Sequence, residues 1–208
     1  MRIKKILNGP FATNSYLLER KEECVVIDPG LEKELMVKEI KGCGKALTGI
    51  IGTHCHPDHI GAVSFLKKEF GAPFYLHIDE KPYLGSFKEI ANFIGIFDVE
   101  VPVVDVFIKS EGKLEVGGFA FEVIHTPGHT PGSVSLLLDG VLFTGDTLFS
   151  GSVGRVDLPG GSQEELYKSL EKLCALDDDL KVYPGHGQDS VLGYEKKFNP
   201  FLREVLAR

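Results

Sequence analysis

The chain has 208 residues, of which 43% are hydrophobic and 25% charged, and its formal net charge is −7. These values are typical of a soluble globular protein with a full core, and the length favours a single domain over residues 1–208. The acidic balance argues against nucleic-acid binding, the absence of a long apolar run argues against a membrane span, and the lack of an apolar signal core after Met1–Lys5 predicts a cytoplasmic protein.

The first half of the chain alternates between short apolar runs and helical patterns. We predict strands over Arg2–Leu7, Ser15–Leu18, Cys24–Ile27, Leu47–Ile51 and Pro73–His77. We predict helices over Leu31–Lys41, with Gly42 as its end, and over Ile60–Phe70. Residues 79–104 permit two interpretations, a helical excursion over a pocket or a connection that packs on the core, and we favour the connection.

The second half begins with a predicted β meander and ends with helix–strand units. The predicted strands are Val106–Ile108, Lys113–Val116, Phe119–Ile124, Ser133–Leu138, Val141–Phe143 and Lys181–Tyr183. A helix is expected from Ser162 to about Leu176, where Ser162 and Glu165 fit a capping box, and a closing helix over Phe198–Ala207. This order of elements predicts an α/β (α+β) protein with two sheets covered by helices.

The densest chemical motif follows the predicted strand Leu47–Ile51. It reads His54-x-His56-x-Asp58-His59, with four side chains that can bind metals on one turn. Imidazole nitrogens suit zinc or iron, and carboxylate oxygens complete a harder site. The motif therefore predicts a metal site at the end of this strand.

Three further candidates lie in loops that follow apolar runs. They are His129, Asp146 and His186, and each is flanked by Gly or Pro. Glycine lets the backbone turn sharply and approach other groups closely. Together with the first motif, these loops are a strong signal of a metal site.

On these residues the chain resembles the metallo-β-lactamase superfamily, and within it the short, single-domain members similar to glyoxalase II, the hydroxyacylglutathione hydrolase. The stretches Asp28-Pro29-Gly30, Gly154–Gly161 and Asn199–Leu202 also fit this group. The resemblance implies a four-layer αββα sandwich with the site at one edge. It implies one metal on His54, His56 and His129. A second metal would lie on Asp58, His59 and His186, with Asp146 bridging the two.

The resemblance also implies an activity. We expect a dinuclear metal-dependent hydrolase that cleaves thioesters of the S-2-hydroxyacylglutathione type, such as S-lactoylglutathione to lactate and thiol, by a metal-bridging hydroxide. Asp58 and Asp146 would be the catalytic residues. Two divalent ions are expected as cofactors, zinc first and iron or manganese as alternatives. The expected partner is a small-molecule thioester, and the oligomeric state stays open.

Substrate contacts are less constrained by the sequence. Arg155 lies where the family's loop can reach a substrate carboxylate, and the alternative is a surface ion pair with Asp157. Full-length glyoxalase II enzymes carry a C-terminal helical domain that helps to bind glutathione, and we expect that domain to be absent here. The identity of the thiol therefore stays open.

Two other functions remain as alternatives. One is a mononuclear iron persulfide dioxygenase, which the superfamily builds on a similar motif. The other is a non-catalytic metal-binding or regulatory protein of the same fold, which the complete set of candidate ligands disfavours. A β-lactamase is disfavoured because the zinc enzymes of that type lack an aspartate that bridges as Asp146 would.

Overall fold

The computed structural model describes residues 1–207, which form two compact units. The first unit comprises residues 1–109 and 115–120, and the second comprises residues 110–114 and the chain from Phe121 onward. Each unit is organised around one six-stranded sheet. The two sheets agree with the prediction from the order of elements.

The sheet of the first unit has the strand order β1-β2-β3-β4-β5-β6. The first three strands are antiparallel neighbours, whereas β3 to β6 run parallel to one another. The carboxyl ends of β3, β4 and β5 therefore meet at one edge. The strands span β1 Arg2–Asn8, β2 Thr13–Arg20, β3 Glu23–Ile27, β4 Ala46–Ile51, β5 Phe74–His77 and β6 Val106–Ile108.

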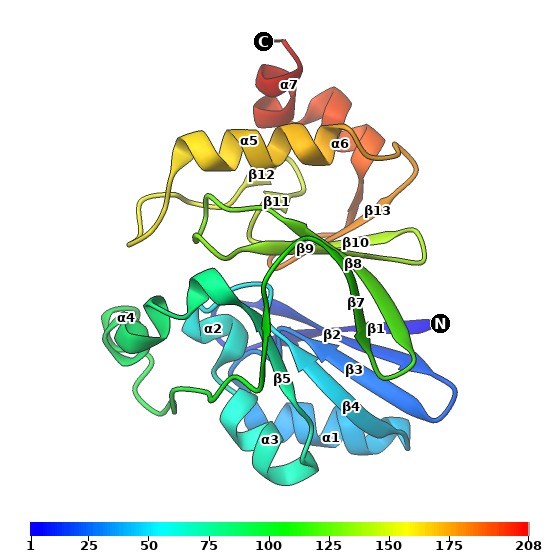
Figure 1. Ribbon diagram of the computed structural model, residues 1–208, viewed down its shortest axis with the longest axis vertical. Helices are drawn as coiled ribbons and strands as arrows, with labels where there is room; N and C mark the ends of the chain where they lie inside the picture. The colour runs from blue at the N-terminus through cyan, green and yellow to red at the C-terminus, as the bar shows by residue number, and fades with distance from the viewer. Residues whose placement is uncertain (208) are drawn as a thin grey trace. The chain divides into compact units, whose positions relative to one another are not determined.

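Helices α1 (Lys33–Cys43) and α3 (Val63–Phe70) lie on one face of this sheet (Figure 1). Their buried side chains, including Met36, Ile40 and Leu66, pack with the strands into one apolar cluster. The same unit contains a one-turn helix and a helical connection between β5 and β6. These elements are α2 Pro57–Ile60, the 3₁₀ turns η1 Ile78–Glu80 and η2 Tyr83–Ser86, and α4 Phe87–Phe93.

The sheet of the second unit has the strand order β14-β13-β10-β9-β8-β7. Strands β10 and β13 are parallel, so their carboxyl ends lie at the same edge. A two-stranded ribbon, β11 and β12, follows β10. The strands span β7 Gly112–Val116, β8 Phe119–His125, β9 Val134–Leu138, β10 Val141–Gly145, β11 Leu148–Phe149, β12 Ser152–Val153, β13 Lys181–Pro184 and β14 Ser190–Val191.

Three helices cover one face of this second sheet (Figure 1): α5 (Gln163–Cys174), α6 (Leu192–Phe198) and α7 (Pro200–Leu206). Leu170 and Leu202 are among the helix residues that pack with Leu142 of β10 into the apolar core of the unit. The predicted cap of α5 is present, since the Ser162 side chain accepts a hydrogen bond from the Glu165 backbone N–H.

The differences from the predicted elements concern ends and short pieces. The helix predicted over Ile60–Phe70 is wrong at its start, because Pro57 begins the separate helix α2 and the longer helix starts only at Val63. The closing helix begins at Pro200, where Asn199 caps it, rather than at Phe198. The strands β11, β12 and β14 have two residues each and are too short to produce a periodic sequence pattern, and the helix α6 was not predicted.

The connection over residues 79–104 packs on the core, as favoured. Phe87, Ala91 and Val99 are buried in the apolar cluster of the first unit. Phe93 and Phe97 in the same segment are exposed. The segment therefore closes one part of the core while it presents two aromatic rings to solvent.

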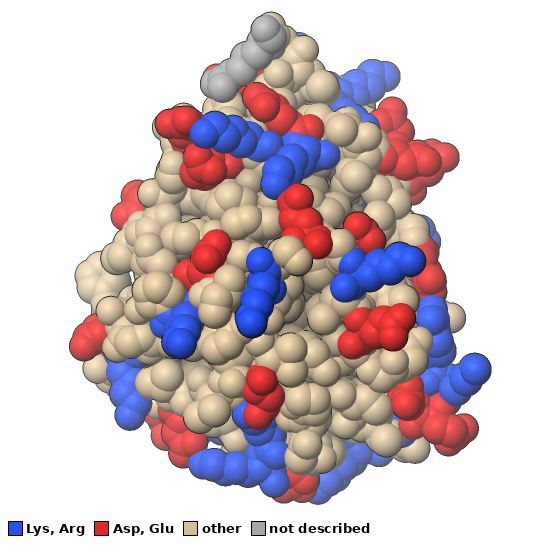
Figure 2. All heavy atoms as spheres, viewed as in Figure 1, with Lys and Arg blue, Asp and Glu red and all other residues tan. Residues whose placement is uncertain are grey.

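Charges of both signs are interspersed on the face of the molecule shown in Figure 2. Exposed ion pairs occur in the structure as well, such as those of Lys168 with Glu164 and Glu165 on α5. No helix within residues 1–207 is both long enough and apolar enough to cross a membrane.

Candidate metal centre

The histidine loop, residues 53–59, comprises the chain that follows β4 and the first three residues of α2. His54 and His56 lie on the extended part of the loop, and Asp58 and His59 lie in the first turn of α2. All four side chains are buried. The His54 ring lies 4.8 Å from the His56 ring, edge on, and 4.1 Å from the His59 ring, measured between centroids. The structure therefore gathers the four predicted donors of the first unit, which we call the first donor group.

Asp28, directly after β3, holds one end of the histidine loop. Its Oδ1 accepts a hydrogen bond from the Thr53 backbone N–H (2.7 Å), and its Oδ2 accepts one from the Thr53 hydroxyl (2.7 Å). The same Oδ2 lies 3.0 Å from Nδ1 of His59. A carboxylate only accepts hydrogen bonds, so Nδ1 of His59 carries the proton and Nε2 keeps its lone pair.

The Thr53 hydroxyl extends this arrangement to His54. Because the hydroxyl donates to Asp28, its oxygen accepts from Nδ1 of His54, which lies 3.0 Å away. Nε2 of His54 is thereby left as the basic nitrogen. One carboxylate thus sets the tautomer of two histidines. In the same unit, the Thr13 hydroxyl donates to Oδ2 of Asp58 (3.1 Å).

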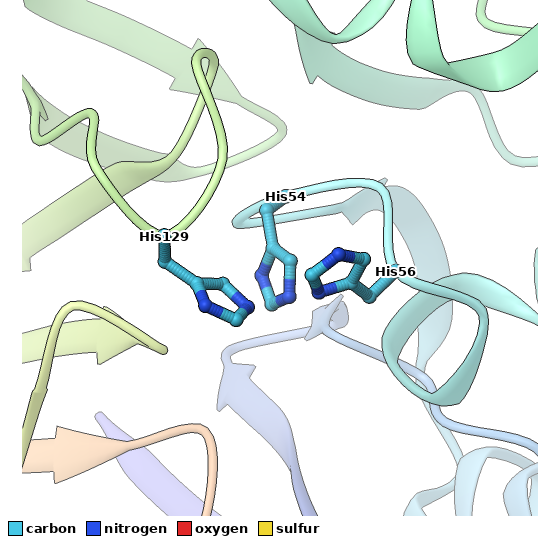
Figure 3. A group of neighbouring side chains, drawn as sticks. All are labelled: His54, His56 and His129. Carbon is cyan, nitrogen blue, oxygen red and sulfur yellow. The ribbon is translucent and has the colours of Figure 1, made fainter. Parts of the chain in front are cut away.

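The second donor group consists of His129, Asp146 and His186, which lie on three loops of the second unit. His129 follows β8, Asp146 follows β10 and His186 follows β13. Nε2 of His129 is 3.5 Å from Oδ2 of Asp146, and Nε2 of His186 is 3.6 Å from the same oxygen. The structure therefore brings these three predicted residues together. In Figure 3, His129 extends from the loop after β8, and His54 and His56 extend from the histidine loop.

Main-chain groups hold the second donor group in place. The backbone carbonyl of Arg155 accepts a hydrogen bond from Nδ1 of His129 (2.7 Å), which leaves Nε2 of His129 facing Asp146. A Cβ atom on Gly154 would lie 1.8 Å from the backbone oxygen of Asp146 and 3.3 Å from Nδ1 of His129. Only glycine therefore lets the chain after β12 press so closely on both ligand loops.

The separations between donor atoms fit a metal. Nε2 of His59 is 3.5 Å from Oδ2 of Asp58, and Nε2 of His129 is also 3.5 Å from Oδ2 of Asp146. This distance exceeds a normal hydrogen bond. Two ligands that each lie about 2.1 Å from one tetrahedral ion stand about 3.4 Å apart. Nitrogen donors with fixed tautomers, paired with carboxylates, suit Zn²⁺, Fe²⁺ or Mn²⁺.

Arg155 makes the ion pair that the sequence offered as the alternative to a substrate contact. Its Nε lies 2.6 Å from Oδ1 of Asp157 and its Nη2 lies 2.8 Å from Oδ2. The hydrogen bonds from Arg155 lower the pKa of Asp157 to about 2. Both side chains are well exposed, at 60% and 67%, and a role of Arg155 in substrate binding stays a prediction.

Sequence reasoning gave no role to Asp28, Thr53 or Gly154, although Asp28 and Gly154 belong to stretches that carried the family resemblance. The available signal for Asp28 was its place directly after a strand, since carboxyl ends of neighbouring parallel strands share an edge. Two residues close to the candidate donors in the sequence have other surroundings. The Cys55 side chain is buried, and Nε2 of His125 is hydrogen-bonded to the Pro131 carbonyl at 2.8 Å.

The sequence profile of the metallo-beta-lactamase superfamily matches residues 8–186. A Haemophilus influenzae protein named hydroxyacylglutathione hydrolase GloC is 36% identical, over 97% of this chain and 98% of its own length. A Bacillus subtilis protein named probable metallo-hydrolase YqgX is 38% identical, over 97% of this chain and 98% of its own length.

Solved structures show the same architecture. The B3 metallo-beta-lactamase BLEG-1 superimposes with a TM-score of 0.89 at 38% identity, over 97% of this chain and 99% of its own. TTHA1623, solved in a di-iron-bound form, superimposes with a TM-score of 0.89 at 38% identity, over 96% of this chain and 100% of its own. ETHE1 from Myxococcus xanthus superimposes with a TM-score of 0.81 at 28% identity, over 99% of this chain and 90% of its own. The predicted fold class is confirmed.

Proposed function

We propose, on the premise that this chain belongs to the metallo-beta-lactamase superfamily, that it is a metal-dependent hydrolase whose substrates are small-molecule thioesters. The membership predicted from the motifs is confirmed by the family match. The metal, the substrate and the residue roles below are proposals, and so is the expectation that the two units act as a single domain over residues 1–208.

One observation carries the proposal. In each unit, an imidazole Nδ1 is bonded to an acceptor, while Nε2 of the same ring faces a carboxylate oxygen at 3.5 Å. Within each unit, a basic nitrogen and a carboxylate oxygen therefore lie side by side, as the ligands of one metal ion do. The full-length similarity to a protein named hydroxyacylglutathione hydrolase supports a hydrolase that acts on thioesters.

We assign the donors as the family pattern implies. His54, His56 and His129 would hold one ion. Asp58, His59 and His186 would hold the other, and Asp146 would be shared.

Two bound divalent cations would supply the Lewis acidity that makes water nucleophilic near neutral pH and polarises the thioester carbonyl. The residues of the chain supply the geometry. Asp28 and Thr53 keep Nε2 of His59 and His54 available, and the Arg155 carbonyl does the same for His129. Asp58 and Asp146 would orient the attacking water. A thiolate leaves readily, so a strong general acid is not required.

The test is a kinetic screen of the purified protein, with its metal content measured by elemental analysis and with zinc, iron and manganese loaded in separate samples. S-lactoylglutathione and thioesters of other thiols are the main substrates. Glutathione persulfide with an oxygen electrode tests the dioxygenase alternative. A chromogenic β-lactam tests the activity that the name of BLEG-1 suggests. Thioester turnover with two bound ions is expected.

Two outcomes overturn the proposal. One is oxygen consumption with persulfide, or β-lactam cleavage, without turnover of any thioester. The other is the absence of all activity in metal-loaded protein, which favours the non-catalytic alternative. The variants His56→Ala and Asp146→Ala should lose bound metal and turnover together. Wild-type activity in metal-free Asp146→Ala would contradict the assigned ligands.

A further inference from the structure

A second buried carboxylate contacts the histidine loop, at its centre rather than at its start. Glu80 is the last residue of η1, the turn that follows β5, and its side chain is completely buried. Its Oε2 accepts a hydrogen bond from the backbone N–H of Cys55 at 2.8 Å. Cys55 stands between the candidate ligands His54 and His56.

The Cys55 side chain is buried as well. Burial raises the pKa of the thiol well above its usual value, and the charge of Glu80 raises it further. The contact on which the following steps depend is the hydrogen bond from the Cys55 backbone N–H to Glu80.

The topology explains why two carboxylates reach this loop. Strand β4 lies between β3 and β5 in the sheet, and the three strands are parallel. Asp28 follows β3 and Glu80 follows β5, so the loop after β4 is approached from both neighbouring strands. Asp28 binds the N–H of Thr53, and Glu80 binds the N–H of Cys55, two residues along.

The bond to Glu80 restrains one particular peptide. The Cys55 N–H belongs to the peptide that joins His54 to Cys55, and a rotation of this peptide would turn the His54 and His56 side chains relative to each other. Asp28 restrains the peptide that joins Gly52 to Thr53, and the turn of α2 restrains the chain after His56, where the His56 carbonyl accepts from the His59 N–H (3.0 Å). Of the peptides between these points, Glu80 holds the one that joins His54 to Cys55.

We propose that Glu80 is a positioning residue of the metal centre, which sets the relative orientation of His54 and His56 through the Cys55 N–H. The inference rests on the proposal above that these histidines bind a metal ion. Substitution of a group that supports a metal ligand typically weakens metal affinity about 10- to 100-fold. The contact requires an acceptor oxygen at the distance from the backbone that the Glu80 side chain provides, and the negative charge of Glu80 is secondary.

The experiment measures zinc affinity by competition with a chromophoric chelator, and the visible spectrum of the Co²⁺-loaded protein. Glu80→Ala should bind zinc at least about 10-fold more weakly, with an altered Co²⁺ spectrum. Glu80→Gln keeps an oxygen at the same reach and should stay within about 3-fold of wild type. Glu80→Asp keeps the charge but is one methylene shorter, so it should bind zinc as weakly as Glu80→Ala does. If Glu80→Ala does not fold, Glu80→Asp replaces it in the experiment.

Two control variants isolate the contact. Cys55→Ala removes the thiol but keeps the N–H, and it should bind zinc as wild type does. Asp79→Asn changes a partly exposed carboxylate on the same turn and should leave zinc affinity and the Co²⁺ spectrum unchanged. Thermal unfolding of every metal-free variant separates positioning from stability, because a purely structural role lowers the melting temperature without altering affinity or spectrum.

Three results would overturn the inference. The first is an unchanged zinc affinity and Co²⁺ spectrum in both Glu80→Ala and Glu80→Asp. The second is a Glu80→Gln variant that binds zinc more weakly than Glu80→Asp does. The third is a loss of zinc affinity in Cys55→Ala equal to that in Glu80→Ala. If the wild-type protein binds none of zinc, cobalt, iron and manganese, the proposed function itself fails, and this outcome is recognised before any variant is compared.

Discussion

The two donor groups are held by different means. In the first unit, the four donors lie within six consecutive residues, and a buried carboxylate, Asp28, fixes two of the histidines directly or through Thr53. In the second unit, the donors come from three separate loops, and a main-chain carbonyl and a glycine take the place of the carboxylate.

The difference shows which positions a single substitution can disturb. A side chain that supports a ligand can be deleted, and the ligand then loses its partner. A carbonyl that supports a ligand persists in every variant, so it is disturbed only when the backbone moves. The first donor group should therefore be sensitive to polar substitutions, and the second to substitutions that add volume or alter the backbone.

The largest effect is expected from Asp28→Ala. The variant removes three hydrogen bonds to Thr53 and His59 and leaves buried donors without an acceptor. We expect zinc affinity to fall about 100-fold and the metal-free protein to lose stability. Chelator competition and urea unfolding measure the two quantities. An affinity within a few-fold of wild type would show that the carboxylate does not set the histidine tautomers.

The next effect tests the second donor group. In Gly154→Ala, the new methyl group would clash with the Asp146 backbone oxygen, so the chain must move away from His129 and Asp146. We expect zinc affinity to fall about 30-fold, within the range for groups that support ligands. Gly42→Ala is the matched control, since nothing lies within 4 Å of its added methyl group. Equal affinities in the two variants would contradict the proposed close approach.

A smaller effect is expected when the link between Asp28 and His54 is cut. Thr53→Val keeps the shape of the side chain but removes the hydroxyl that bonds to both residues. We expect a loss of about 10-fold in zinc affinity, because the Thr53 backbone bond to Asp28 remains. Thr53→Ser retains the hydroxyl and should restore the affinity. If serine fails to rescue, the methyl group rather than the hydroxyl is the important part of Thr53.

The smallest effect is expected from Arg155→Ala, because its carbonyl still supports His129 while the exposed ion pair with Asp157 is lost. The pKa of Asp157 is lowered to about 2, so the ion pair stabilises the folded protein above the unfolded pKa of about 4. That contribution disappears as the pH falls toward 2. Melting temperatures of wild type and variant should differ slightly at pH 7 and converge at low pH.

The same variant tests substrate binding. If Arg155 pairs with a substrate carboxylate, KM for an acidic thioester should rise about 10-fold while kcat changes little. A neutral thioester should show no such rise, and Asp157→Asn is the control for loss of the ion pair alone. An unchanged KM for all substrates would assign Arg155 to the surface pair only.

The sequence by itself determined the superfamily, the fold class and the residues that are candidate donors. The reason is that the four donors of the histidine loop lie within six residues of one another, so that their spacing can be recognised without knowing the fold. Each donor of the second group lies between Gly or Pro residues after an apolar run, which made those loops recognisable as well.

The supporting contacts were decided only by the tertiary structure. Asp28 and Glu80 lie far along the chain from the residues that they hold, and they reach the loop because β3 and β5 flank β4. Strand order is a property of the folded sheet, so the place of Asp28 after a predicted strand did not show which loop it would hold, and no local pattern indicated Glu80. The need for glycine at position 154 likewise comes from its distance to Asp146, a distance that exists only once β10 and the chain after β12 are packed together.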